Sequence, residues 1–323
     1  MENIVVCKTE DLSESDWIKY AESFNGAFGK EFQADFFRRK YASAGGGSSF
    51  HALLKPDAGA IAGACTAMPM SILDGTRKIN AALLVDVFIA QKYRTNPMTL
   101  MKMYRRLAGK LKECGCAIVL AVPNAMAYPY WKNIVKMADI GDINYWVIPV
   151  RLGNILKRFK FLNPFSAILS SAALFLSKTF FAPRGDKHTR SYRFSIETDK
   201  EYLARRFPPD IYVRASSDGC EYCYRICDEN GVSVAYIMYF TENSRRTGRA
   251  LYAALRDIMA KNPDIIIHVG KMPFRQCAMI RLPRKFEPKR LPLVFDRLSE
   301  SELPENISNM AEWDFGLSNY DVR

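Results

Sequence analysis

Two short segments of the sequence place polar and basic side chains between an apolar run and a helical pattern. The first, VDVFIAQKYRTNP, spans residues 85–97, and the second, LAVPNAMAYPYW, spans residues 120–131. Each is typical of a buried strand that passes through a polar turn into a helix. The first turn of a helix has unpaired backbone N–H groups and the positive end of the helix dipole, so it attracts phosphate. We therefore expect a phosphate-bearing ligand at the helix that follows residue 97.

Both segments resemble motifs of the GNAT-type N-acetyltransferases. The first is similar to a strand ending in V-x-P-x-Y-R-G-x-G-x-G, where the loop amides hold the pyrophosphate of acetyl-coenzyme A. The second is similar to P-N-x-x-S-Y-x-x-F, where the Asn contacts the cofactor arm and a Tyr near the thiol protonates the departing thiolate. The combined match covers about residues 3 to 150 in order and spacing.

The resemblance implies an acyltransferase that takes an acetyl or other acyl group from acyl-coenzyme A to an amine or hydroxyl. Such a reaction needs a base, an oxyanion donor and a group that protonates the thiolate. Asp86 is the implied base and Tyr128 the implied acid, with hydrogen bonding in the sheet and core packing as the respective alternatives. The residues implied to bind acetyl-CoA are Val87, Phe88, Ile89, Arg94, Thr95, Asn96, Met98, Thr99 and Asn124.

The first segment departs from the glycine pattern of the family. Thr95, Pro97 and Thr99 stand where the family has glycines. Glycine lets the backbone approach a phosphate closely, and Pro97 has no N–H to donate, although proline suits the first position of a helix. Two hypotheses follow: an enzyme with an altered loop, or a catalytically inactive GNAT-fold binding or scaffold protein for a glycan or a lipid-linked substrate.

The surrounding sequence predicts an α/β chain with a mixed central sheet. Ser13, with Asp16 three residues on, is the expected N-cap of a first helix. The expected elements after it are a helix at 31–43, strands at 50–54, 60–73 and 79–89, a helix at 98–112, a strand at 116–122, a helix at 127–135 and a strand at 143–150. The helical crossover predicts that strands 83–90 and 116–122 are parallel neighbours.

A similar order of elements recurs after residue 190. The expected elements are a helix at 199–207, strands at 211–215, 221–227 and 232–240, a helix at 246–261, a strand at 264–269 and a last strand after residue 312. We therefore expect two tandem GNAT-like halves. They are a domain at 1–150, a basic and apolar helical linker at 151–190, and a degenerate second domain at 191–323.

The tandem arrangement resembles double-GNAT proteins, which include acyltransferases of bacterial cell-surface polysaccharide and FemAB-like aminoacyl ligases. This fold-level analogy suggests a sugar of cell-surface polysaccharide biosynthesis as the acceptor. The composition limits other partners. A net charge of +12 and a pI near 9.3 favour anionic partners. No zinc-finger, RNP or helix-turn-helix pattern is present, so we do not expect nucleic acid as a partner.

The linker sequence is basic and then apolar. RLGNILKRFK at 151–160 precedes FLNPFSAILSSAALFLSKTFF, in which Asn163-Pro164 and several serines interrupt the apolar run. A spanning helix needs about 20 predominantly apolar residues, so we expect no membrane span. The basic flanks are compatible with a helix at 155–181 that lies on an anionic membrane surface, while an apolar helix of this kind equally fits a position packed in the core or in a dimer contact.

The N-terminal residues show no secretory signal pattern, so the expected location is the cytoplasm, with peripheral contact to the inner face of the membrane. The eight cysteines are then expected as reduced thiols. One cluster, Cys220, Cys223 and Cys227, has spacing that a zinc site with Cys277 or His268 would need, but we expect buried thiols and no metal. His51 lies in a predicted strand and is expected to be a core histidine.

Overall fold

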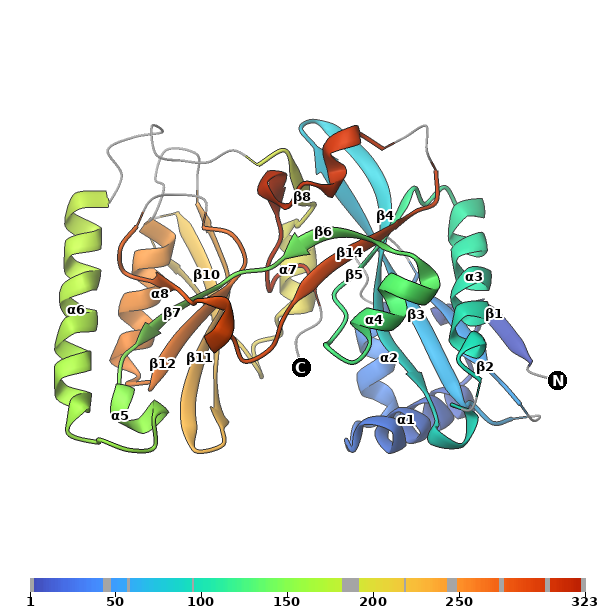
Figure 1. The fold of residues 1–323 in the computed structure, drawn as a ribbon, viewed down its shortest axis with the longest axis horizontal. Helices are drawn as coiled ribbons and strands as arrows, with labels where there is room; N and C mark the ends of the chain where they lie inside the picture. The colour runs from blue at the N-terminus through green and yellow to red at the C-terminus, as the bar shows by residue number, and fades with distance from the viewer. Residues whose placement is uncertain are drawn as a thin grey trace. The chain divides into compact units, whose positions relative to one another are not determined.

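The computed structural model describes residues 3–42, 48–56, 59–94, 96–181, 192–217, 219–242, 249–272, 276–299 and 303–320. The chain forms two compact units (Figure 1). The first consists of Met1–Asp142, Arg193–Arg206 and Leu291–Glu312, and the second of Ile143–Tyr192, Phe207–Arg290 and Trp313–Arg323. The units are interleaved along the chain, whereas the sequence predicted consecutive domains at 1–150 and 191–323 with a separate linker.

The first unit is built on a mixed sheet. Its strands are β1 (Ile4–Lys8), β2 (Phe50–Leu54), β3 (Gly63–Asp74), β4 (Arg77–Ile89), β5 (Ile118–Ala121), β6 (Ala138–Asp142), β8 (Phe194–Ile196) and β14 (Pro292–Arg297). The order is β1-β2-β3-β4-β5-β14-β6, and β8 pairs with the far end of β3. Only β4 and β5 are parallel among these pairs, with Ala81 opposite Ile118 and Leu84 opposite Ala121, which confirms the predicted crossover.

The first unit also contains helices. They are α1 (Glu14–Phe28), α2 (Ala34–Ala42), α3 (Met98–Glu113), α4 (Tyr128–Tyr130), which continues as a π turn (Trp131–Val135), and α7 (Lys200–Arg206). The predicted cap of α1 is confirmed, since the Ser13 side chain accepts a hydrogen bond from the Asp16 amide and the Asp16 carboxylate accepts one from the Ser13 amide. Both orphan amides at this helix end are thereby satisfied.

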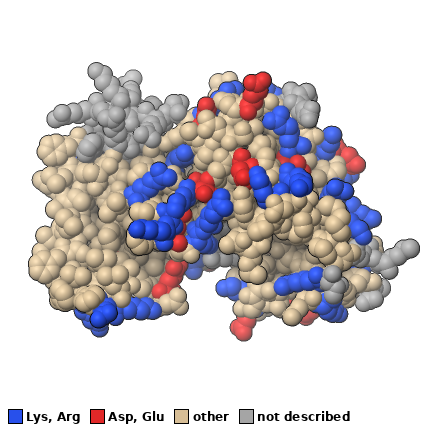
Figure 2. All heavy atoms as spheres, in the orientation of Figure 1, with Lys and Arg blue, Asp and Glu red and all other residues tan. Residues whose placement is uncertain are grey.

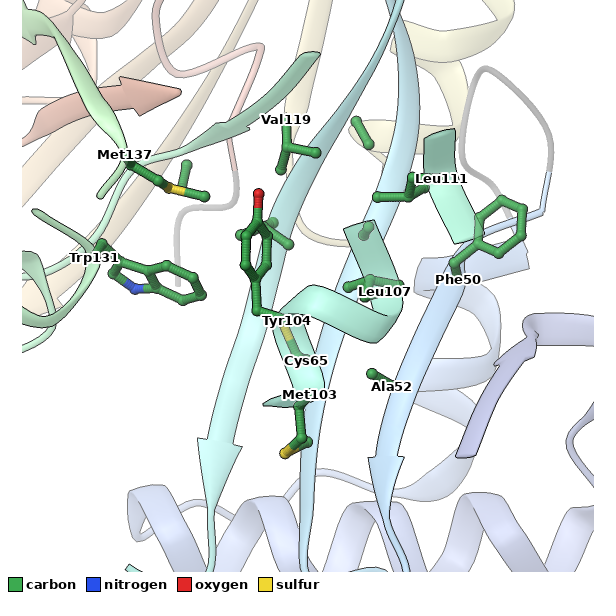
Figure 3. Packing of buried hydrophobic residues seen from close by; sticks show 14 of the residues in the cluster. Phe50, Ala52, Cys65, Met103, Tyr104, Leu107, Leu111, Val119, Trp131 and Met137 are labelled. Carbon is green, nitrogen blue, oxygen red and sulfur yellow. The ribbon is translucent and has the colours of Figure 1, made fainter. Parts of the chain in front are cut away.

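One part of the core of the first unit lies between α3 and the sheet (Figure 3). Met103, Tyr104, Leu107 and Leu111 recur at helical spacing on one face of α3, and all four are buried. Sheet residues such as Ala52, Cys65 and Val119 meet them, and Trp131 and Met137 close one side. This packing fixes the position of α3 relative to β4 and β5, and hence the position of its N-terminus.

The second unit has its own mixed sheet. Its strands, in the order β13-β7-β12-β11-β10-β9, are β13 (Ile280–Arg281), β7 (Tyr145–Pro149), β12 (Ile265–Val269), β11 (Val232–Glu242), β10 (Cys220–Glu229) and β9 (Val213–Ser217). Its helices are α5 (Leu152–Ile155), α6 (Leu162–Phe181) and α8 (Arg249–Ala260). β11 and β12 are parallel and joined through α8, as β4 and β5 are joined through α3. The predicted recurrence of the fold is therefore present.

The two halves of the sequence exchange a strand between the sheets. β7 comes directly after the first half of the sequence, but it pairs with β12 and β13 in the second sheet. β14 comes from the second half and lies between β5 and β6 in the first sheet. The sequence placed residues 143–150 in the first domain and did not predict β14. The expected last strand after residue 312 is only the two-residue β15 (Trp313–Asp314).

Candidate active site

The candidate site lies in the first unit, where β4 runs past the end of β5. The parallel pairing stops at Leu84 and Ala121, but β4 continues to Ile89. A 3-10 turn, η2 (Gln91–Tyr93), then leads to α3 at Met98. Among the described strands, none pairs with residues 85–89 on the side that faced β5. The predicted succession of strand, basic loop and helix is confirmed here.

β4 carries a bulge at Asp86 and Val87. Val85 is opposite Thr66 and Phe88 is opposite Ala64, so two residues of β4 face the single residue Cys65 of β3. Asp86 has a φ of 50°, a conformation that costs free energy for a residue with a Cβ. Bulges and strained residues of this kind concentrate next to active sites, where they redirect the backbone.

Gly63 allows the close approach of β3 to this part of β4. A Cβ on Gly63 would lie 2.8 Å from the carbonyl oxygen of Phe88 and 3.2 Å from the Cα of Ile89. Any larger residue would push the end of β4 away. The Phe88 ring itself is buried against Phe24 at a centroid distance of 5.5 Å, so a cofactor role for Phe88 rests on its backbone.

The side chain of Asp86 points into the protein. Its carboxylate accepts a hydrogen bond from the Lys40 ammonium at 2.6 Å and another from the Tyr41 hydroxyl, both on α2. The Lys40 and Asp86 side chains are 8% and 4% exposed, so this is a buried ion pair. Asp86 as a whole is only half-buried, so its exposed part is mainly backbone. The sequence offered a hydrogen bond within the sheet as the alternative role of Asp86, but the carboxylate bonds Lys40 and Tyr41 of α2.

A chain of buried polar groups extends from this ion pair. The Tyr41 hydroxyl lies 2.8 Å from that of Tyr20, which lies 3.2 Å from Oγ1 of Thr66. Nδ1 of His51 lies 3.0 Å from the same Thr66 oxygen, and its Nε2 lies 2.9 Å from Oγ1 of Thr9. Burial lowers the pKa of His51 to about 3, so the ring is neutral near pH 7. His51 is therefore the core histidine that the sequence predicted.

The loop between β4 and α3 satisfies several of its own amides. Oδ1 of Asn96 accepts from the Met98 amide at 2.9 Å, and the Asn96 carbonyl accepts from the Thr99 amide at 3.1 Å. The Arg94 Nε donates to the Ile89 carbonyl at 2.7 Å. Asn96 thus caps α3, which its position two residues before the helix could have indicated. Thr95 lies outside the described residues.

The loop also carries exposed positive charge. Lys92 and Arg94 are both exposed, and the Lys92 ammonium lies 4.8 Å from the ring centroid of Tyr93. The exposed helix end at Met98 adds the positive end of the helix dipole. Charge and helix end therefore suit a phosphate, although the Met98 and Thr99 amides already have acceptors.

The second segment is held by its own polar contacts. Oδ1 of Asn124 accepts from the Ala127 amide at 2.8 Å, so Asn124 caps the turn into α4. The Tyr128 hydroxyl donates to Oδ1 of Asp139 at 2.9 Å, and the Lys132 ammonium bonds Oδ2 of Asp139 at 2.6 Å. The sequence did not indicate Lys132 or Asp139, because both residues lie outside the two motifs.

Tyr130 joins the two segments. Its hydroxyl donates to the carbonyl of Pro97 at 2.7 Å, which ties α4 to the start of α3. Burial raises the pKa of Tyr130 to about 12, so the phenol stays protonated and keeps its donor. The structure thus brings Arg94, Asn96 and Tyr128 onto neighbouring connections of one sheet.

The predicted cysteine cluster contributes nothing to this site. Among the described residues, no three His, Cys, Asp or Glu side chains come together as a metal site would require. The Cys220 side chain is not among those described. Cys223 is buried in the second unit, and burial raises its pKa to about 12, so it is a protonated thiol.

Comparison with known proteins places the fold. No protein-family model matches the chain, and no curated protein matches it in sequence. Solved structures do match. N-myristoyltransferase from Saccharomyces cerevisiae with bound myristoyl-CoA is 9% identical, with a TM-score of 0.55 over 91% of this chain and 83% of that one. A GCN5-related N-acetyltransferase from Anabaena variabilis is 12% identical, with a TM-score of 0.57 over 92% and 73%.

A third similar structure is a conserved protein from Enterococcus faecalis described as a probable N-acyltransferase. It is 10% identical, with a TM-score of 0.57 over 92% of this chain and 73% of that chain. Identities this low establish the fold and leave the activity to be argued from the site. The mixed sheets, the parallel β4 and β5 pair and these likenesses agree: the chain has the GNAT fold of the N-acyltransferases.

Proposed function

We propose that this protein transfers an acyl group from acyl-coenzyme A to an amine or hydroxyl acceptor. The observation that carries the proposal is the course of β4. It runs past its parallel partner at Leu84, bulges at Asp86 and Val87, and leads into the exposed N-terminus of α3. The edge of β4 offers backbone amides to the extended arm of the cofactor. The N-terminus of α3 offers positive charge to the phosphates at the end of that arm.

The phosphate end of the cofactor suits α3. This helix is 16 residues long, and Lys92 and Arg94 are exposed in the loop before it. The Met98 amide bonds Asn96, so a phosphate oxygen would replace the Asn96 side chain as its acceptor. Because Pro97 lacks an N–H, we assign more of the phosphate contact to the two cationic side chains than to backbone amides.

The arm of the cofactor suits residues 85–89. An extended molecule with amide groups can pair with an open strand edge as an added strand does. Bound acyl-coenzyme A supplies the activated thioester. Tyr128, oriented by its hydrogen bond to Asp139, is the residue we assign to protonate the departing thiolate. Its side chain is half-buried, and for this step its O–H would turn from Oδ1 of Asp139 to the thiolate sulfur, while the proton that the acceptor loses would return to the phenol oxygen through solvent water.

Asp86 fits a positioning role better than the predicted role of base. Its carboxylate is 4% exposed and already neutralises Lys40. To accept a proton from a substrate it would have to release that lysine inside the protein, which leaves a buried charge without its partner. We therefore assign Asp86 to holding the bulge, with the exposed backbone of the bulge turned to the ligand.

Acetyl is our first choice of acyl group, and a sugar amine or hydroxyl of cell-surface polysaccharide is our first choice of acceptor. We propose in addition that residues 155–181 contact the inner face of a membrane peripherally. No helix among the described residues is both long and apolar enough to cross a membrane.

A second candidate function is that of a binding protein without catalysis. It is favoured by one observation, that the Met98 and Thr99 amides have acceptors within the loop. If this loop is closed to phosphate, the fold serves to hold a glycan or a lipid-linked substrate.

Titration calorimetry with acetyl-CoA and with desulfo-coenzyme A separates the two functions. We expect binding that weakens at least tenfold in the R94A variant and stays unchanged in R38A, an exposed arginine of α2 in the same unit. Asn124→Asp keeps the capping oxygen and removes the amide donor, so it tests contact with the cofactor without uncapping α4. No binding at millimolar cofactor would refute acyl transfer and favour the binding protein.

A further inference from the structure

The longest helix of the second unit carries its apolar side chains outward. Six large apolar residues on or next to α6 are between 62% and 71% exposed. They are Phe161, Phe165, Ile168, Leu169, Phe175 and Phe180. Most recur at spacings of three, four or seven residues and so form one stripe along the helix. We call this stripe the outer face of α6.

The inner face of α6 is attached by hydroxyl groups. Ser166 donates to the carbonyl of Val150 at 2.9 Å, and Ser170 donates to the carbonyl of Pro149 at 3.2 Å. Ser177, which is fully buried, lies 2.9 Å from the hydroxyl of Tyr252 on α8. The usual arrangement, with apolar residues inward, is reversed. The outer face is therefore not needed to hold α6 to its unit, since serines and small apolar residues do this.

The charged residues within the segment that contains α6 have one sign. Residues 151–181 contain no Asp or Glu, and they contain Arg151, Lys157, Arg158, Lys160 and Lys178. Lys157, Arg158 and Lys160 are exposed directly before the first residue of the outer face. Figure 2 shows the α6 side of the second unit almost wholly without charged residues, with basic residues gathered at the end near α5. A stripe of six large, exposed apolar side chains on one helix is typical of an interaction site.

We propose that the outer face of α6 docks this protein onto an anionic lipid surface. In that position the helix lies in the plane of the interface, its Phe, Leu and Ile side chains enter the acyl-chain boundary, and the cations before it meet the headgroups. This docking surface deepens the proposed membrane contact and rests on it, but it does not depend on acyl-coenzyme A binding. The absence of acidic residues in 151–181 favours anionic lipid over a second copy of this basic chain.

Sedimentation of the full chain with vesicles tests the docking surface. We expect the protein to sediment with equimolar phosphatidylcholine and phosphatidylglycerol vesicles at low salt and to bind pure phosphatidylcholine vesicles at least tenfold more weakly. Phe165→Gln combined with Leu169→Gln should lower binding to the anionic vesicles at least tenfold. Lys157→Gln combined with Lys160→Gln should weaken binding and reduce its dependence on salt.

The matched control is Phe286→Gln. Phe286 is an apolar residue of the same unit that is 62% exposed but lies outside α6. This variant should bind vesicles like the natural protein. Protein that stays in the supernatant with anionic vesicles at low salt would overturn the proposal, as would equal losses in F286Q and in the α6 variant.

The same samples test whether a second copy of the chain, instead of lipid, covers the outer face of α6. Light scattering across a range of protein concentrations detects a dimer, and a dimer that the α6 substitutions abolish, without any vesicle binding, would assign the face to a second copy. Calorimetry with acetyl-CoA in the absence of vesicles reports on the cofactor site alone. Failure of lipid docking is thereby separated from failure of acyl-coenzyme A binding.

Discussion

Lys40→Met removes one partner of the buried ion pair at the bulge. It keeps the length of the lysine stem and removes the Lys40 ammonium from the Asp86 carboxylate, which the Tyr41 hydroxyl still contacts. Both side chains are less than a tenth exposed, so water cannot replace the lost partner. Breaking a buried ion pair on one side costs about 3–5 kcal/mol. We expect Lys40→Met to lower the free energy of unfolding of the first unit by that amount.

Asp86→Asn is the reciprocal change. Asparagine tolerates the left-handed conformation, so the substitution at a φ of 50° adds little backbone strain. It leaves Lys40 charged and buried and should also be strongly destabilising. The double variant removes both charges at once. Its cost should be smaller than the sum of the two single costs, with a coupling of about 1–3 kcal/mol.

Urea unfolding followed by circular dichroism measures these costs, and hydrogen exchange at β4 amides assigns the transition to the first unit. Arg38→Met is the matched control. Arg38 lies on the same helix and pairs with Glu14 at 3.0 Å, but both side chains are more than half exposed, so the pair should contribute about 0–1 kcal/mol. Strictly additive costs of Lys40→Met and Asp86→Asn would refute the buried pair as the support of the bulge.

Two further predictions concern the same unit. Burial lowers the pKa of His51 from 6.5 to about 3, so only the unfolded chain binds its proton between these values. The free energy of unfolding should therefore decrease as the pH falls from 6.5 toward 3, by about 1.4 kcal/mol per unit of pH. Urea midpoints measured across this pH range should show this decrease in the natural protein, and His51→Gln should lack it. Gly63→Ala should cost about 1–3 kcal/mol and weaken acetyl-CoA binding, because the new Cβ meets the Phe88 carbonyl at 2.8 Å. Gly109 is the control, because it is exposed on α3 and a Cβ there would have no neighbour within 4 Å. Gly109→Ala should stabilise the helix by about 0.5–1 kcal/mol. Equal effects of the two substitutions on thermal unfolding would contradict this explanation.

Local patterns in the sequence predicted much of the site, and contacts over long sequence distances account for the rest. The strand, basic loop and helix around residues 85–97 follow from an apolar run and a proline, and these are local signals. The Asp86 carboxylate at the bulge pairs with Lys40, which is 46 residues away in the sequence. No pattern within the strand indicates that a lysine of α2 supplies the counter-ion. The partners of Asp86 and Asp139 could therefore be identified only from the fold.

The orientation of α6 was also beyond the sequence pattern. Its apolar residues recur at helical spacing, which ordinarily predicts an inward face. The serines lie inward instead, because the carbonyls of Pro149 and Val150 accept their hydroxyl protons. The same sequence thus fits a helix whose apolar face points inward or one whose apolar face points outward, and the burial of Ser170 and Ser177 decides between these two orientations.

The strand exchange explains why consecutive domains were the wrong expectation for the first sheet. β5 needs β14 on its other side, and β14 comes after residue 290. Three apolar residues of β14, Leu293, Val294 and Phe295, are no more than 5% exposed. Their burial contributes about 5–9 kcal/mol, taking roughly 1.5–3 kcal/mol for each side chain. That is comparable with the whole stability of a domain, which is about 5–15 kcal/mol.

A fragment of residues 1–150 should therefore not fold stably by itself. It lacks β14, so the edge of β5 is left open to other chains, and the Tyr104 hydroxyl loses its hydrogen bond to Asp296. Joining residues 291–312 to the fragment through a flexible linker should restore cooperative thermal unfolding by circular dichroism and a dispersed amide spectrum. Because the two fragments share residues 1–150, their difference isolates the contribution of residues 291–312. If residues 1–150 alone unfold cooperatively at the temperature of the longer fragment, then β14 is dispensable and the first half is an independent domain after all.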